Sequence, residues 1–250
     1  MERDSALYPW TAVGRVNFST GGYCSGVLVT SNLVLTAAHC LYFQAARDWY
    51  PVQTVSFSAG RAADGPQIQA KAIDYRTSAA FDPNDKTQIK NMTYDWGLIT
   101  LDRPIGDEVG FFGVANVDRD GFAAMHARAS SFARAGYNAD ALKAAALQLD
   151  CPVDGYFDGL ELLQHRCPMA LGDSGGPIVA FLPEGPAIIG VQSGRLATRT
   201  NWWGTAVPAS TFYQSIAFTK SGQAAGATDP AGYAGAPPAA ARPAVAEVAP

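Results

Sequence analysis

The chain has little charge, few histidines and no long apolar run, and each shortage excludes a class of protein. Only 16% of its 250 residues are charged and the net charge is −4. Because Lys and Arg form no cluster, we expect neither nucleic acid nor an anionic membrane surface as a partner. No apolar run approaches the roughly 18 residues that a membrane-spanning helix needs. The start, MERDS, lacks the apolar core of a signal peptide, so the sequence is either a mature form or not exported by that route.

Four cysteines are present, at positions 24, 40, 151 and 167, and none belongs to a CxxC pair. With only three histidines in the chain, a zinc site is a poor interpretation of this pattern. An even number of separated cysteines favours two disulfides and an oxidising compartment.

The distribution of apolar residues predicts an all-β protein. Short runs rich in Val, Ile, Thr and aromatic residues recur between Gly, Asn, Asp and Pro, as in SGVLVT, WGLITL and AIIGVQSG, which is typical of a barrel or sandwich. Helical periodicity is limited to 138–149 and to 208–220, where Ser210 is the candidate N-cap. Residues 222–250 are nearly all Ala, Gly and Pro, and we expect them to form a flexible, disordered tail.

A turn-like segment, GDSGG at 172–176, raises the question of catalysis. Ser174 could lie in a simple tight turn, or it could be a nucleophile, which would need a base, an orienting acid and an oxyanion site. His39 is the candidate base because it ends the apolar run NLVLTAAHC, whereas we expect His126 and His165 in surface loops. Asp95 is the candidate acid, since it directly precedes the apolar run WGLITL.

These residues occur in three ordered blocks, PWTAVGRV…CSGVLVTSNLVLTAAHC, YDWGLITLDRP and GDSGGPIV. The blocks resemble the signatures of the trypsin/chymotrypsin family of serine proteases, from about Tyr8 to Lys220. Finer detail resembles the bacterial branch that includes glutamyl-endopeptidase-like enzymes. The nucleophile elbow of α/β-hydrolases is excluded, because that fold needs a histidine after the serine and none follows Ser174.

The resemblance implies a fold, a mechanism and a set of roles. The fold would be two packed six-stranded antiparallel β-barrels, at 1–115 and 116–221, with a short C-terminal helix before the tail. Ser174 would attack a peptide carbonyl, His39 would move the proton, and Asp95 would orient His39. The backbone N–H groups of Gly172 and Ser174 would form the oxyanion hole. No cofactor or metal is implied.

The cysteines also fit the resemblance. The step from Cys24 to Cys40 is similar to the family's clamp beside its histidine. Cys151 and Cys167 bracket the loop that leads to Ser174, and we expect them to form the second disulfide. A metal site at Asp154 or Asp158 is a weaker alternative interpretation of this loop.

The sequence departs from the animal members of the family at two points. Pro168 stands where, in those members, an acid confers cleavage after Lys or Arg. We therefore expect this protein to prefer a neutral or acidic residue before the scissile bond. The other expected substrate-binding residues are Gln192, Ser193, Gly194, Arg195 and Gly204. Asp173 has no new apolar N-terminus to pair with, so it must find another cation or stay solvated.

The expected activity is therefore that of a monomeric, secreted or periplasmic serine endopeptidase acting on proteins or peptides. The tail could join it to another domain or partner. The alternative is a binding or regulatory protein with a protease fold, held inactive because Asp173 lacks its partner.

Overall fold

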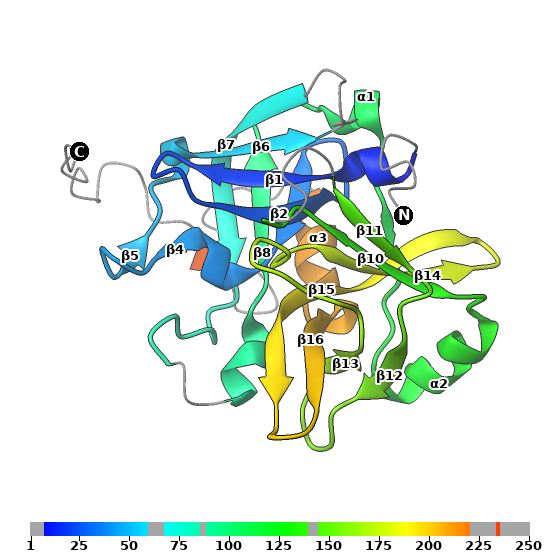
Figure 1. Cartoon of the computed structure of the whole chain (residues 1–250). Coiled ribbons are helices and arrows are strands. Elements are labelled where there is room, and N and C mark those ends of the chain that lie inside the picture. Colours follow the sequence, from blue (N-terminus) through cyan, green and yellow to red (C-terminus); the bar gives the residue numbers. More distant parts are fainter. Residues whose placement is uncertain (1–7, 60–67, 86–88, 140–144, 221–233, 236–250) are drawn as a thin grey trace.

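A computed structural model of the chain describes residues 8–59, 68–85, 89–139, 145–220 and 234–235 (Figure 1). Most of the described residues that have regular structure lie in strands. The helical elements are short: η1 Trp10–Ala12, η2 Ala38–Leu41, η3 Val52–Thr54, η4 Ile89–Tyr94, α1 Gly106–Val109, α2 Arg119–Arg128, η5 Ala209–Thr211 and α3 Tyr213–Lys220. No helix in the described part of the chain has the length and apolar character to span a membrane.

The first sheet closes into a six-stranded antiparallel barrel. Its strands are β1 Val13–Phe18, β2 Tyr23–Leu28, β3 Leu33–Thr36, β6 Val55–Ala59, β7 Ile68–Thr77 and β8 Gly97–Leu101. The order is β7-β6-β1-β2-β3-β8, and β7 pairs with β8 to close the ring. The strands form here because their inward positions are apolar, as in β1, where Val13, Val16 and Phe18 are buried. The predicted first barrel is confirmed.

The second sheet has eight strands and is open. They are β9 Gly113–Val114, β10 Phe132–Gly136, β11 Ala146–Leu149, β12 Val153–Tyr156, β13 Leu163–His165, β14 Pro177–Leu182, β15 Gly185–Ala197 and β16 Trp202–Pro208. The order is β11-β10-β14-β15-β16-β13-β12, and β9 pairs with β15. Among the described residues no pairing joins β11 to β12, so this unit is a half-barrel rather than a second closed barrel. Although β9 precedes residue 115, it belongs to this sheet.

Two minor strand pairings complete the fold. A small ribbon pairs β4 Tyr42–Phe43 with β5 Asp48–Trp49. In the segment that we expected to be a disordered tail, the structure describes only β17, Ala234–Gly235, which pairs with the end of β7. The rest of that segment lies outside the described residues.

The two sheets share one core. Buried side chains from the first barrel, such as Leu35 and Leu98, belong to the same apolar cluster as Val191 and Val207 of the second sheet. The short helix expected near the C-terminus is present as α3. The segment that leads into it returns to the first barrel, where the rings of Trp96 and Phe212 lie 6.1 Å apart. The candidate functional residues lie where the two sheets meet.

The expectations for the helices need three corrections. The helix expected at 138–149 is wrong in part, because Ala146–Leu149 forms strand β11, which pairs with β10. This pairing overrides the helix propensity of Ala and Leu. Residues 140–144 of the expected helix lie outside the described residues. Ser210 lies within η5, whose N-cap is Pro208. Helix α2 was not predicted, and its N-cap Asp118 accepts a hydrogen bond from the Gly121 amide.

Candidate active site

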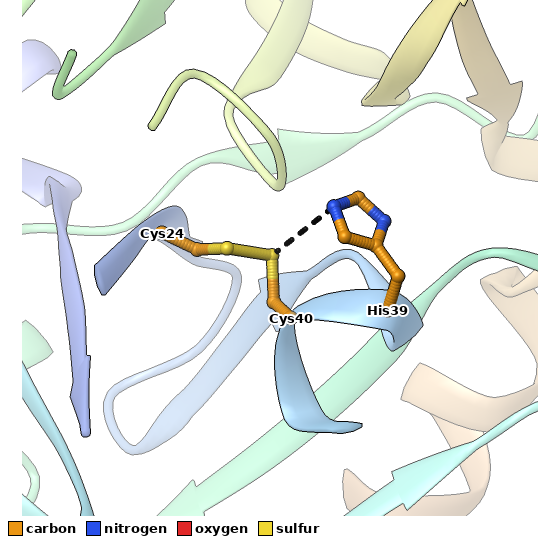
Figure 2. Close-up of side chains that lie close together, drawn as sticks. All are labelled: Cys24, His39 and Cys40. Atoms are coloured by element: carbon orange, nitrogen blue, oxygen red, sulfur yellow. Dashed lines mark hydrogen bonds between the residues drawn. A yellow bond between two sulfur atoms is a disulfide. The ribbon is translucent and has the colours of Figure 1, made fainter. Parts of the chain in front are cut away.

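His39 is held at the end of a buried strand. The run Leu33–Thr36 forms β3, whose four residues are all buried, and the chain then turns through η2, which carries His39. The next residue, Cys40, forms a disulfide with Cys24 of β2, as the resemblance implied. The covalent link fixes the backbone on which the imidazole stands (Figure 2).

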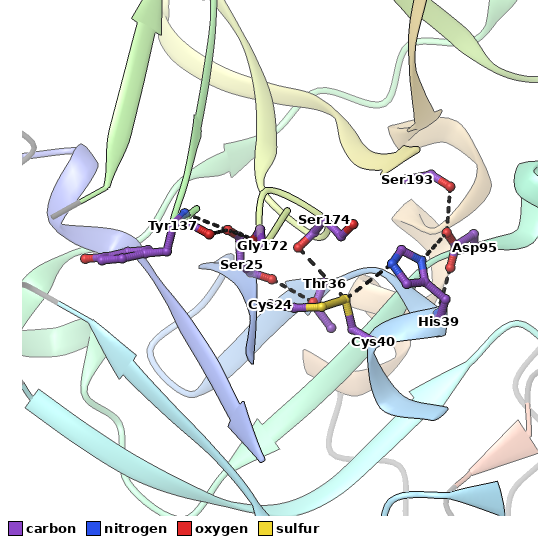
Figure 3. Close-up of a disulfide and its surroundings, with 10 residues drawn as sticks. All are labelled: Cys24, Ser25, Thr36, His39, Cys40, Asp95, Tyr137, Gly172, Ser174 and Ser193. Carbon is purple, nitrogen blue, oxygen red and sulfur yellow. Dashed lines mark hydrogen bonds and ion pairs between the residues drawn. A yellow bond between two sulfur atoms is a disulfide. The ribbon is translucent and has the colours of Figure 1, made fainter. Parts of the chain in front are cut away.

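Asp95 lies two residues before the start of β8 and contacts His39 twice. Its Oδ2 is 2.7 Å from His39 Nδ1, and its Oδ1 accepts a hydrogen bond of 2.8 Å from the His39 backbone amide. Ser193 of β15 donates a third hydrogen bond, of 2.6 Å, to Oδ2 (Figure 3). The carboxylate side chain is only 6% exposed, so these three donors replace the water that a buried charge would otherwise need.

The pair shifts both pKa values. Burial alone would lower the pKa of His39, but the negative charge of Asp95 and its hydrogen bond raise it above 6.5. Burial alone would raise the pKa of Asp95, but the charge of His39 and the hydrogen bonds from His39 and Ser193 lower it. Asp95 is therefore ionised at neutral pH, and it orients the imidazole and favours its protonated form.

Ser174 lies in the turn that precedes β14, between glycines with unusual backbone angles. Gly172 has φ of +99° and Gly175 has φ of +83°, a region that residues with a Cβ rarely adopt. A Cβ at Gly172 would lie 2.5 Å from the Tyr137 carbonyl oxygen. The glycines of GDSGG therefore allow this turn to adopt its backbone angles and to pack closely against Tyr137.

The same turn lies beside His39. The sulfur of Cys40 is 3.8 Å from His39 Nε2 and 3.9 Å from the Ser174 carbonyl oxygen, so both residues surround one atom of the disulfide (Figure 3). In the described structure the Ser174 hydroxyl makes no hydrogen bond to His39. Catalytic hydrogen bonds often tighten only when substrate binds.

The backbone N–H groups of Gly172 and Ser174 have no acceptor in the described part of the chain. The neighbouring amides do: Gly175 donates to the Gln192 carbonyl and Gly176 to the Asp173 carbonyl. Two free amides on one tight turn can donate to a developing oxyanion.

Asp173 has a partner that the sequence did not reveal. Its Oδ1 is 2.7 Å from Nη1 of Arg134 on β10, and both side chains are buried. Asn138 donates to the same carboxylate at 3.2 Å, and the Ala170 amide donates to its Oδ2 at 2.7 Å. The acid that resembles the N-terminus-binding acid of animal relatives is thus paired with an internal arginine. The sequence signal for this partner was the charge of Arg134 inside FARAG, a strand whose other residues are apolar.

The expected substrate-binding residues lie around the end of β15 and β16. Arg195 is exposed on β15, opposite Gly204 of β16, and Pro168 is exposed in the loop before Ser174. Gln192 is buried, and its amide donates to the Gly194 and Thr205 carbonyls. Ser193 points to Asp95.

His165 was expected on the surface, and that expectation is wrong. The side chain is fully buried on β13, opposite Gly204, and it contacts the Gly204 backbone so closely that a Cβ there would overlap the ring. Burial lowers the pKa of His165 to about 4; the charge of Arg134 acts in the same direction, and the Gln192 side chain only partly opposes it. Its neighbours Arg166 and Gln164 are polar, which hid the burial.

Two groups of side chains in the described part of the chain have the residue types that bind metals. Cys24, His39 and Cys40 lie together, as do Cys151, His165 and Cys167. The second pair of cysteines is also a disulfide, as expected, so the sulfur atoms in both groups cannot act as thiolate ligands. Asp154 forms an ion pair with Arg166 at 3.1 Å.

Comparisons with known proteins agree with this architecture. The family model described as Trypsin matches residues 2–140, more than half of the chain. The chain therefore belongs to the trypsin family.

Within that family, the similarity is to glutamyl endopeptidases. A glutamyl endopeptidase of Bacillus licheniformis is 31% identical over 111 residues, which cover 44% of this chain and 32% of the relative. An extracellular metalloprotease of Bacillus subtilis is 32% identical over 112 residues, which cover 44% of this chain and 30% of the relative. The matches thus span about a third of each curated relative.

A solved structure of a Glu endopeptidase in complex with MPD has a similar fold. It superposes with a TM-score of 0.66 at 20% identity, over 88% of this chain and 94% of the other. The expected chymotrypsin-like fold is confirmed.

Proposed function

We propose that this protein is a serine endopeptidase, with Ser174 as nucleophile, His39 as general base and Asp95 as the group that orients His39. The observation that carries the proposal is the His39–Asp95 pair, at 2.7 Å, beside a serine on a glycine turn. Membership of the trypsin family supports the same assignment.

The proposed reaction has two halves. In the first, Ser174 Oγ bonds to the peptide carbonyl carbon while its proton passes to His39 Nε2, and the oxyanion accepts hydrogen bonds from the Gly172 and Ser174 amides. The C–N bond then breaks, and the leaving amine takes the proton from His39, which leaves an ester on Ser174. In the second half, water adds to the ester carbonyl carbon while His39 takes its proton. The bond between that carbon and Ser174 Oγ then breaks, and Oγ takes the proton back from His39, which releases the acid product and free Ser174.

Two alternative functions lose their basis in this structure. An inactive binding protein was motivated by an unpaired Asp173, but Arg134 pairs with it at 2.7 Å. The name of the Bacillus subtilis relative indicates metal chemistry in that protein. Here the Nδ1 of His39 contacts Asp95 and the nearby sulfurs form a disulfide, which suits a proton-transfer role for His39 better than a ligand role.

The triad assignment is tested by substitution. Ser174→Ala and His39→Ala should each lower kcat by several orders of magnitude, on the order of 10⁴ to 10⁶, and the double variant should lose little more, because the residues act as a unit. The measurement is hydrolysis of a peptide p-nitroanilide, together with labelling by a fluorophosphonate probe.

The matched control is His126→Ala, since His126 is exposed on α2. It should label and turn over like the wild type. Labelling of Ser174→Ala at the wild-type rate would contradict the assignment.

For specificity, we propose poor cleavage after Lys and Arg and a preference for neutral or acidic residues. A buried Lys or Arg side chain needs a carboxylate, or its charge remains unpaired, and Pro168 supplies none. The exposed guanidinium of Arg195, at the edge of β15, is a candidate partner for an acidic side chain. The glutamyl endopeptidase relative supports an acidic preference.

A substrate series that varies only the residue before the scissile bond tests this proposal. We expect Glu or a neutral residue to give the highest kcat/KM. Arg195→Ala should reduce kcat/KM for Glu by about two- to fivefold, because an exposed ion pair contributes up to about 1 kcal/mol, and it should barely change kcat/KM for a neutral substrate. Arg199→Ala, an exposed arginine in the same hairpin, is the control. Lys or Arg ranking first would show that a carboxylate elsewhere reaches the pocket.

The setting of the proposed enzyme follows from the same evidence. Two disulfides and a relative named as extracellular favour secretion. We propose proteins or peptides as substrates. We also propose a first unit at 1–115 with His39 and Asp95, a second at 116–221 with Ser174, and the segment 222–250 as an appended tail.

A further inference from the structure

Ser25 joins the first barrel to the turn that carries Ser174. It lies on β2, directly after Cys24, and its side chain is fully buried. The expected triad does not use it. Figure 3 shows Ser25 on the opposite side of the Cys24–Cys40 disulfide from His39, facing Gly172 and Tyr137.

The Ser25 hydroxyl makes two short hydrogen bonds across the junction of the sheets. It accepts from the Tyr137 amide at 2.7 Å and donates to the Gly172 carbonyl at 2.7 Å. The Tyr137 carbonyl is a poorer acceptor for the same proton, at 3.4 Å. Since a hydroxyl has one proton, Gly172 receives it.

The backbone of Ser25 contacts the same turn a second time. Its amide donates to the Ser174 carbonyl at 2.8 Å, and its own carbonyl accepts from Thr36 Oγ1 at 2.8 Å. One residue of the first barrel therefore holds the carbonyls of both Gly172 and Ser174, the two residues whose amides would form the oxyanion hole.

Gly172 has a backbone conformation that depends on its neighbours. A glycine at φ of +99° has no side chain to restrict it. The Ser25 hydroxyl fixes the direction of its carbonyl, and the Tyr137 carbonyl and Tyr23 ring occupy the space where a Cβ would lie. The Gly172 N–H lies in the peptide plane of the Leu171 carbonyl, which accepts a hydrogen bond of 3.0 Å from the Ala139 amide. Because Ser25 holds the following peptide plane through the Gly172 carbonyl, the planes on both sides of Gly172 are fixed, and with them the direction of its amide.

We infer that Ser25 is a positioning residue for the oxyanion hole: its hydroxyl holds the Gly172 backbone so that the Gly172 amide points at the reacting carbonyl. It touches no substrate atom, and it acts through Gly172. The inference rests on the proposed endopeptidase function.

The test is Ser25→Ala, measured with a peptide p-nitroanilide. A displaced oxyanion donor costs less than a deleted one, which lowers rates by about 10²–10³. We therefore expect kcat to fall by about 10- to 100-fold, with KM within about twofold because ground-state binding is not affected. Inhibition by a peptide boronate, whose adduct fills the oxyanion hole, should weaken by the same factor as kcat/KM. The acid limb of the pH profile should not move, since His39 and Asp95 are untouched.

Ser58→Ala is the matched control for loss of a buried hydroxyl. Ser58 is buried on β6 of the same barrel and accepts a hydrogen bond from Asn17 at 3.0 Å, and Arg15 of β1 separates it from Ser25 in the sheet. It should lower the melting temperature without changing kcat.

A second pair of variants covers the case in which Ser25→Ala does not fold. Thr and Val have side chains of the same shape, and Val carries a methyl group where Thr carries the hydroxyl. We therefore expect Ser25→Thr to be at least about tenfold more active than Ser25→Val. Equal activity of this pair, or a Ser25→Ala variant with wild-type kcat and a reduced melting temperature, would show that Ser25 is only structural. A wild-type protein that neither hydrolyses peptides nor reacts with a fluorophosphonate would instead overturn the proposed function, and this role with it.

Discussion

At the scale of single residues, His39 shows how one carboxylate sets a pKa. Burial disfavours the imidazolium ion, whereas Asp95 at 2.7 Å favours it, and the second effect is the larger in sum because charge and hydrogen bonding act together. A general base must be neutral to accept a proton. The raised pKa of His39 therefore moves the onset of activity to higher pH.

We expect the acid limb of kcat/KM against pH to have its midpoint above 6.5, the ordinary histidine value. Asp95→Asn removes the charge that raises the pKa and leaves the burial that lowers it, so its limb should fall below 6.5. Its kcat should also fall by about 10⁴. The measurement is a pH profile of both proteins on one substrate, and an unshifted limb in Asp95→Asn would mean that another group titrates.

At the scale of elements, the turn at Ser174 is held by strands from both sheets. Arg134 of β10 pairs with Asp173 on one side, and Ser25 of β2 bonds to Gly172 on the other. The Arg134–Asp173 pair and the Ser25 hydroxyl are buried, so the loss of either partner leaves a buried polar group unsatisfied. The strands thus position a turn that is too glycine-rich to position itself.

Arg134→Met should damage both stability and activity. It leaves the Asp173 carboxylate buried without its cation, which typically costs about 3–5 kcal/mol. It also frees the turn that carries the proposed oxyanion donors, which should lower kcat by about 10²-fold. Urea unfolding and kcat measure the two effects.

The double variant Arg134→Met/Asp173→Asn separates them. It removes the unpaired charge, so it should recover much of the lost stability. A single Arg134→Met variant with wild-type kcat would contradict the role of this ion pair in the turn.

The elements differ in how well the sequence predicted them. Strands such as Leu33–Thr36 and the GDSGG turn were predictable, because apolar runs and glycines act locally. The candidate triad could be proposed because its three blocks keep their order. Strand β11 was missed because its pairing with β10, rather than local propensity, decides it. Helix α2 was missed although its N-cap, Asp118, is a local signal.

Contacts between distant residues could not be predicted. Ser25 and Gly172 are 147 positions apart, and no feature of either segment indicates that the two residues are in contact. Arg134 was visible as a charge in a strand, but its partner Asp173 was not. His165 was misplaced because polar neighbours suggested exposure, while its burial depends on the Gly204 backbone of another strand.

At the scale of the whole molecule, His39 and His165 make the free energy of unfolding depend on pH in opposite directions. The raised pKa of His39 gives stability that is fully present below about 6.5 and is lost as pH rises through its folded value. The lowered pKa of His165 acts the other way, because the unfolded chain binds a proton there that the folded protein does not. Because the His39 contribution also changes between about pH 5 and pH 7, a comparison of the wild type with a His165 variant is needed to isolate the His165 contribution.

We therefore predict that acid destabilises the fold through His165 between about pH 7 and pH 5. With an unfolded pKa of 6.5 and a folded pKa of about 4, the free energy of unfolding should be lower at about pH 5 than at about pH 7 by about 2 kcal/mol from this group. Urea unfolding of the wild type and of His165→Gln at both pH values tests this, because the variant should lose that part of the pH dependence whatever its absolute stability. His126→Gln, on the exposed side of α2, controls for the substitution itself. Parallel pH dependence in the wild type and His165→Gln would mean that His165 is protonated inside the folded protein, and the buried, neutral state assigned to it here would be wrong.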